Sequence, residues 1–191
     1  MNLLTDDEGE MAVSLARGTI EHKISNKQKP VLDLTSIFQE KRGVFVTLNK
    51  EGNLRGCIGF PYPMIPLANA IEQAAIASAL EDPRFPQVRP NELKLIDLEV
   101  TILTVPEPLN CSPEERPSKI EVGKHGLIIR GLGTSGLLLP QVATDYGWDS
   151  KTFLDHTCMK AGLPNRCWMH DNVEVLAFEG QIFSELHNKV R

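Results

Sequence analysis

The sequence predicts an α+β fold in which a mainly antiparallel sheet is flanked by helices and the chain forms two intimately packed lobes. Apolar residues repeat with helical spacing over the first 27 residues, which indicates an amphipathic helix. Short β-branched runs come in pairs joined by turn-forming residues, as is typical of antiparallel hairpins. Each half contains the order glycine, strand, turn, strand, proline, helix, which suggests an internal duplication.

The first helix is predicted to begin after Thr5 and to extend to about Lys27. Thr5 is suited to be the N-cap, and Glu8 occupies the capping-box position three residues later. Asp6 and Asp7 place negative charge at the positive end of the helix dipole. An apolar stripe follows along one side, so we expect this helix to cover a sheet.

A β-hairpin is expected next, after a polar loop. The runs at 44–48 and 54–58 predict its two strands, because turn-forming residues lie between them. The prolines that follow exclude regular structure, since proline lacks an N–H group. Pro66 is then expected to be the first residue of an alanine-rich helix, and a β-branched run predicts a strand at 98–105.

The chain is predicted to be a single domain, 1–191, with lobes at about 1–106 and 119–191. The segment between them contains several prolines and is expected to be a surface loop. The same periodicity arguments apply to the second half. Its expected elements are strands at 127–130, 136–139 and 173–178, a further strand at 181–184, helices at 141–146 and 150–161, and a frayed tail after residue 185.

The composition is that of a globular protein. Of 191 residues, 41% are hydrophobic and 24% are charged, which is enough apolar chain for a sizeable core. The formal net charge of -5 argues against nucleic acid as the main partner. The sequence contains no bilayer-spanning apolar run and no signal-peptide pattern, so we expect a cytoplasmic protein that does not associate with membranes.

The stretch 54–59, which reads Leu-Arg-Gly-Cys-Ile-Gly, is the main candidate for a functional site. Glycine allows the backbone to approach other groups closely, and Arg55 would favour the reactive thiolate of Cys57. Backbone N–H groups between Gly56 and Gly59 could hold an oxyanion. Alternatively, Cys57 is a small buried residue that only fills the space between glycines.

His125 is the predicted general base for Cys57, provided that it comes within hydrogen-bond reach. The alternative is a structural histidine that bonds a carbonyl or caps a strand end. Basic residues near both motifs could hold an anionic ligand, although Asp82 could instead pair with Arg84 and fix its own loop. The candidate ligand-binding residues are Arg55, Gly56, Gly59, Arg84 and Lys124.

The four cysteines, Cys57, Cys111, Cys158 and Cys167, are scattered along the chain. Because none forms a C-x-x-C pair, the sequence predicts neither a zinc site nor a redox pair. No other metal-ligand pattern and no cofactor motif is present, so the cofactor is left unspecified. In a reducing cytoplasm we expect all four cysteines to be free thiols.

Several further motifs are spread over nearly the whole chain. They lie at 82–85, 98–100, 123–126, 135–143, 148–149 and 153–154. Together with the cysteine stretch, they resemble the AMMECR domain family, in its stand-alone prokaryotic form. The resemblance implies a two-lobed α+β fold with the cysteine motif in or beside a cleft. It also implies a pathway link to Memo-like and radical SAM proteins, which accompany the family in some genomes.

Two functions remain open. The first is a cytoplasmic cysteine-assisted enzyme, a transferase or hydrolase, that acts on a small or peptide-borne substrate in the interlobe cleft. In it, Cys57 attacks, His125 moves the proton and Arg55 orients an anion. The second is a non-catalytic module that binds a small molecule or a protein in the same cleft. Its contacts would come from aromatic and proline residues at 60–63 and 85–86.

Overall fold

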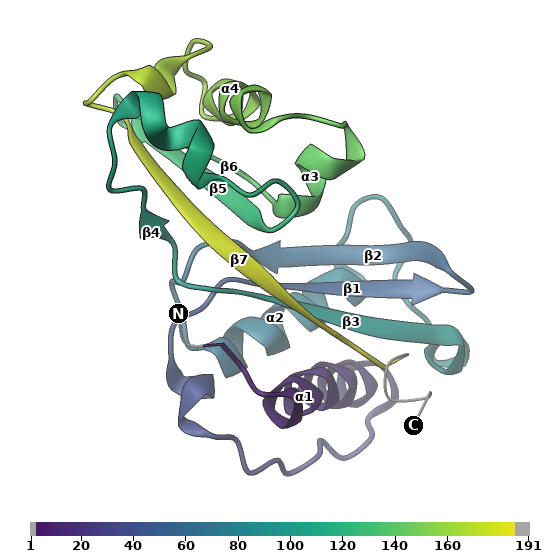
Figure 1. Ribbon diagram of the computed structural model, residues 1–191. Coiled ribbons are helices and arrows are strands. Elements are labelled where there is room, and N and C mark those ends of the chain that lie inside the picture. The colour runs from purple at the N-terminus through teal and green to yellow at the C-terminus, as the bar shows by residue number, and fades with distance from the viewer. Residues whose placement is uncertain (1–2, 186–191) are drawn as a thin grey trace. The chain divides into compact units, whose positions relative to one another are not determined.

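The computed structural model describes residues 3–185 and combines helices with antiparallel sheet, as predicted (Figure 1). The chain divides into two compact units. One comprises Met1–Thr104 together with Gln181–Arg191, and the other comprises Val105–Gly180. The lobes expected at about 1–106 and 119–191 stay a prediction about domain organisation.

The first unit contains three antiparallel strands in the order β2-β1-β3 and two helices. Its elements are α1 (Asp6–Ser25), η1 (Ser36–Gln39), β1 (Val44–Lys50), β2 (Asn53–Phe60), α2 (Leu67–Leu80), η2 (Pro90–Leu95) and β3 (Ile96–Leu103). Alternate strand residues such as Val46 and Val100 are fully buried against apolar residues of both helices. One face of this sheet is therefore covered by α1 and α2 (Figure 1).

The helix ends of the first unit test two predictions. The capping box at α1 is confirmed, because Thr5 accepts from the Glu8 N–H while the Glu8 carboxylate accepts from the Thr5 N–H. The placement of Pro66 is wrong by one residue. Pro66 has extended backbone geometry and is the N-cap, so α2 begins at Leu67.

The second unit contains a hairpin that pairs with a long strand. Its strands are β4 (Glu107–Pro108), β5 (His125–Gly131), β6 (Thr134–Leu138) and the part of β7 (Glu174–Ser184) that precedes Gln181. Its helices are α3 (Pro140–Asp145) and α4 (Ser150–Lys160), with the short 3-10 helices η3 (Pro113–Lys119) and η4 (Cys167–Met169). Strand β5 lies between β6 and β7, and β4 also pairs with β7. Apolar residues of β5, including Leu127 and Ile129, pack with Phe153 and Leu154 of α4.

Two predictions for the C-terminal region are adjusted. The strands expected at 173–178 and 181–184 are one continuous strand, β7, because Gly180 continues the extended backbone. The tail predicted to fray after residue 185 lies outside the described residues.

Both units contain a hairpin followed by a helix, but this shared order does not establish common descent, so the internal duplication stays a prediction.

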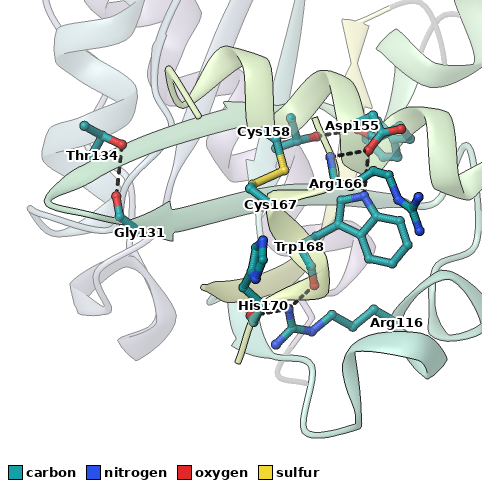
Figure 2. The surroundings of a disulfide bond; sticks show 11 residues. Arg116, Gly131, Thr134, Asp155, Cys158, Arg166, Cys167, Trp168 and His170 are labelled. Atoms are coloured by element: carbon teal, nitrogen blue, oxygen red, sulfur yellow. Dashed lines mark hydrogen bonds between the residues drawn. A yellow bond between two sulfur atoms is a disulfide. The ribbon is translucent and has the colours of Figure 1, made fainter. Parts of the chain in front are cut away.

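The expectation of four free thiols is wrong for two of them. Cys158 of α4 and Cys167 of η4 form a disulfide, with Cα atoms 6.0 Å apart (Figure 2). The chain reverses between them, and Asp155 of α4 holds the returning segment by accepting from the Arg166 N–H and the Trp168 indole N–H, each at 2.8 Å. The two cysteines are nine positions apart and meet only because the chain folds back, so no C-x-x-C motif marked this disulfide in the sequence.

Among residues 3–185, no helix has the length and apolar character needed to cross a membrane.

Candidate functional site

Cys57 lies near the centre of β2, at the edge of the strand order β2-β1-β3. Because side chains alternate along a strand, Gly56 and Ile58 face α2, whereas Cys57 faces the opposite side. A Cβ atom on Gly56 would lie 2.2 Å from the Ser78 carbonyl oxygen, so only glycine allows α2 to approach this closely. This packing explains Gly56 without a ligand, and its predicted ligand-binding role stays a prediction.

The Ser78 hydroxyl links α2 to the hairpin directly behind Cys57. It accepts a hydrogen bond from the Ile58 N–H at 2.8 Å and donates one to the Val46 carbonyl at 2.7 Å. The hydroxyl is therefore inserted between β1 and β2 and satisfies one buried group of each strand. This arrangement fixes the backbone on both sides of the cysteine.

The loop after α2 covers the sheet edge at Cys57. The Asp82 carboxylate accepts from the Cys57 N–H at 2.9 Å, and the Arg84 guanidinium donates to the Cys57 carbonyl at 3.0 Å. Two side chains thus satisfy the backbone groups that a neighbouring strand would otherwise pair. Asp82 also accepts from Nε of Arg84 at 2.9 Å, which confirms the pairing considered from the sequence.

The Asp82–Arg84 pair is charged at neutral pH. Hydrogen bonds from the Arg84 side chain hold the pKa of the Asp82 carboxyl well below its usual range, although burial opposes this effect. In return, Asp82 raises the pKa of Arg84. The side chain of Arg84 is 53% exposed, and its guanidinium carbon lies 5.5 Å from the centroid of the Phe85 ring.

A hydroxyl contacts the Cys57 sulfur from the next strand. Thr47 is directly opposite Cys57 in the β1–β2 pairing, and its Oγ1 donates to Sγ at 3.4 Å. A donor aimed at sulfur stabilises the thiolate more than the thiol. Glu99 of β3 is directly opposite Thr47, so these three side chains form a row across the sheet. Neither Thr47 nor Glu99 was a sequence candidate.

Arg55, two residues before Cys57, is held by an ion pair. Its Nε and one terminal nitrogen donate to the two carboxylate oxygens of Glu92 at 3.2 and 3.1 Å. The Lys50 ammonium also contacts Glu92 at 3.1 Å. Hydrogen bonding from Arg55 is the main cause that lowers the pKa of Glu92 to about 2. Arg55 thus anchors η2, and its predicted role beside the thiolate or an anion stays a prediction.

His125 and Lys124 lie in the second unit, around Glu179. The His125 Nδ1 accepts from the Glu121 N–H at 3.0 Å, and its Nε2 lies 3.8 Å from Oε1 of Glu179. The Lys124 Nζ lies 3.4 Å from the same oxygen. With Nδ1 acting as acceptor, the neutral imidazole carries its proton on Nε2 and has no free lone pair. This bonding is that of a structural histidine, and the general-base role stays a prediction.

The sequence candidates therefore fall into three local groups. Cys57 is held with Asp82 and Arg84, Arg55 is paired with Glu92, and Lys124 and His125 surround Glu179. Gly59 has a packing role, since a Cβ there would lie 2.4 Å from a Phe45 ring carbon. Across residues 3–185, no three histidine, cysteine or acidic side chains are grouped closely enough to hold a metal ion.

Comparison with known proteins gives consistent matches along the chain. A family model described as AMMECR1 matches residues 13–183. Protein Mbar_A1807 of Methanosarcina barkeri is 54% identical over 188 residues, which cover 96% of this chain and 93% of that protein. A protein of Methanothermobacter thermautotrophicus is 52% identical over 185 residues, covering 95% and 96%. The crystal structure of the uncharacterized protein PH0010 from Pyrococcus horikoshii is similar with a TM-score of 0.78 and 47% identity, covering 95% and 93%.

Proposed function

The chain belongs to the AMMECR1 family, and from this premise we propose that it is a cytoplasmic cysteine-dependent enzyme with Cys57 as its nucleophile. The substrate class is a small or peptide-borne acyl compound, and the reaction is hydrolysis or transfer of the acyl group. Such chemistry fits a modification pathway shared with Memo-like and radical SAM proteins.

The observation that carries this proposal is the hydrogen bond from Thr47 to the partly buried Cys57 sulfur. A cysteine that only fills space would be expected to point into the core, as a small apolar residue. Cys57 instead lies on the sheet face opposite the helices, with a hydroxyl donor at 3.4 Å from its sulfur. Its backbone is fixed by Asp82 and Arg84, which favours a precisely positioned nucleophile.

The proposed reaction proceeds through a thioester. The Cys57 sulfur forms a bond to the substrate carbonyl carbon, the bond from that carbon to the leaving nitrogen or oxygen breaks, and the thiol proton ends on the leaving group. Water or an amine then attacks the thioester, releases the acyl product and returns a proton to the sulfur. For His125 to move these protons, its hydrogen bond from Glu121 must first open.

A second candidate function is a non-catalytic binding module. The contacts of Asp82 and Arg84 with the Cys57 backbone favour this second function, because they explain the position of the cysteine by the structure of the sheet edge alone. Arg55, Arg84 and Lys124 are each paired with a carboxylate, which weakens the case for a strongly anionic ligand.

The two functions are separated by trapping an acyl group. The full chain is mixed with p-nitrophenyl acetate, and acylated residues are identified by mass spectrometry. The enzyme proposal predicts acyl transfer to Cys57 that is lost in Cys57→Ser and kept in Cys111→Ser, since Cys111 is the matched free cysteine. Acylation of Cys57 no faster than Cys111 would favour the binding module.

A further inference from the structure

The face of the first-unit sheet opposite α1 and α2 carries a row of three side chains, those of Cys57, Thr47 and Glu99. Strand pairing places Cys57 opposite Thr47 and Thr47 opposite Glu99. Neighbouring strands are about 4.8 Å apart, so the Cα atoms of Cys57 and Glu99 are separated by about 10 Å. A compact acyl compound bound above Thr47 would have the sulfur at one end and a carboxyl group at the other.

Glu99 differs from the other carboxylates near Cys57 in its bonding. Asp82 and Glu92 are each paired with an arginine. Over residues 3–185, the side chain of Glu99 has no hydrogen bond and no ion pair. A partly buried carboxylate without a cation is costly to keep, so its position calls for an explanation beyond packing.

The surroundings of Glu99 disfavour its charged form. Burial raises the pKa of its carboxyl group. Asp97 lies two residues before Glu99 on β3, Glu185 accepts from the Leu98 N–H and pairs with Arg17, and Arg55 of β2 pairs with Glu92. None of these places an unpaired cation against Glu99.

We propose that Glu99 is the acid–base residue of the Cys57 site and works across Thr47. This inference rests on the proposed function. In the first step the Glu99 carboxylate takes the thiol proton as the sulfur attacks and then, as the carboxylic acid, gives that proton to the leaving group, which leaves Glu99 ionised. In the second step the carboxylate takes a proton from the attacking water, and that proton then returns to the sulfur. His125 is not required for either transfer.

The test compares the wild-type chain with Glu99→Gln and with Asp97→Asn, a control on the same strand face. Acylation of Cys57 by p-nitrophenyl acetate and loss of the acyl group are followed by mass spectrometry between pH 4 and 9. The leaving p-nitrophenolate needs no acid and the thiol proton can pass to solvent, so Glu99→Gln should acylate within about threefold of wild type and deacylate about a hundredfold more slowly. Asp97→Asn should deacylate at the wild-type rate.

The pH profile supplies a readout that a structural role would not change. Deacylation requires ionised Glu99, so the wild-type rate should fall on the acid side at a pH above 4.5, and this limb should vanish in Glu99→Gln. If Glu99→Gln does not fold, Glu99→Asp is used, which should deacylate more slowly and keep the acid limb. If a folded Glu99→Gln variant deacylates at the wild-type rate, the role of Glu99 is overturned and the proposed function is not. If Cys57 of the wild-type chain is not acylated at all, both the role of Glu99 and the proposed function are overturned.

Discussion

Replacing Asp82 tests whether the loop after α2 holds the edge of β2 at Cys57. Asp82→Ala removes the acceptor of the Cys57 N–H and the partner of Arg84. A hydrogen bond from a backbone N–H to a charged acceptor contributes about 2 kcal/mol. The ion pair adds only about 1 kcal/mol, because Arg84 is 53% exposed and solvent screens it. We therefore expect Asp82→Ala to lower the free energy of unfolding by about 3 kcal/mol at pH 7.

The assay is urea denaturation of wild type, Asp82→Ala and the exposed-neighbour control Glu81→Gln, at pH 7 and pH 3. The folded-state pKa of Asp82 is depressed, so its stabilisation is present above the unfolded value of 3.8 and is lost as the pH falls toward the folded value. The difference between wild type and Asp82→Ala should thus shrink at pH 3, while Glu81→Gln stays close to wild type. A difference below about 1 kcal/mol at pH 7, or one unchanged at pH 3, would refute this reasoning.

Three other predictions concern stability and are all measured by urea denaturation. The pKa of Glu92 is about 2 in the folded chain against 4.5 unfolded, so its ionised form should add about 3 kcal/mol to the free energy of unfolding at pH 7. This contribution should be lost between pH 5 and pH 2, and Glu92→Gln should not show that loss. Gly56→Ala should destabilise by about 3 kcal/mol or more, since its methyl group would meet the Ser78 carbonyl; an unchanged midpoint would contradict the packing. Replacing Cys158 and Cys167 together by serine should cost about 2.5 kcal/mol for a loop with a sequence separation of 9, and reductant should then have no further effect.

The features that were predicted correctly are local in the sequence. The capping box of Thr5 and Glu8 spans one helical turn, and the β1–β2 hairpin is defined by a turn between two β-branched runs. In these cases the residues that interact are a few positions apart, so their types and spacing contain the information.

The features that were missed depend on contacts between distant residues. The register of β1 against β3 is set by packing and not by a short turn, so the alignment of Thr47 with Glu99 could not be derived from spacing. The contact of Asp82 with Cys57 joins residues 25 positions apart. The ion pair of Arg55 with Glu92 joins residues 37 positions apart.

The most direct test of the account is the alkylation rate of Cys57 in Cys111→Ser, where it is the remaining free thiol and the disulfide needs no replacement. The rate with iodoacetamide at pH 7 is compared with a short cysteine peptide and with Thr47→Val and Thr47→Ser in the same background. We expect Cys57 to react about tenfold faster than the peptide, with the advantage lost in Thr47→Val and kept in Thr47→Ser. A rate at or below that of the peptide, unaffected by Thr47→Val, would contradict a nucleophilic Cys57 and leave the motif an architectural element.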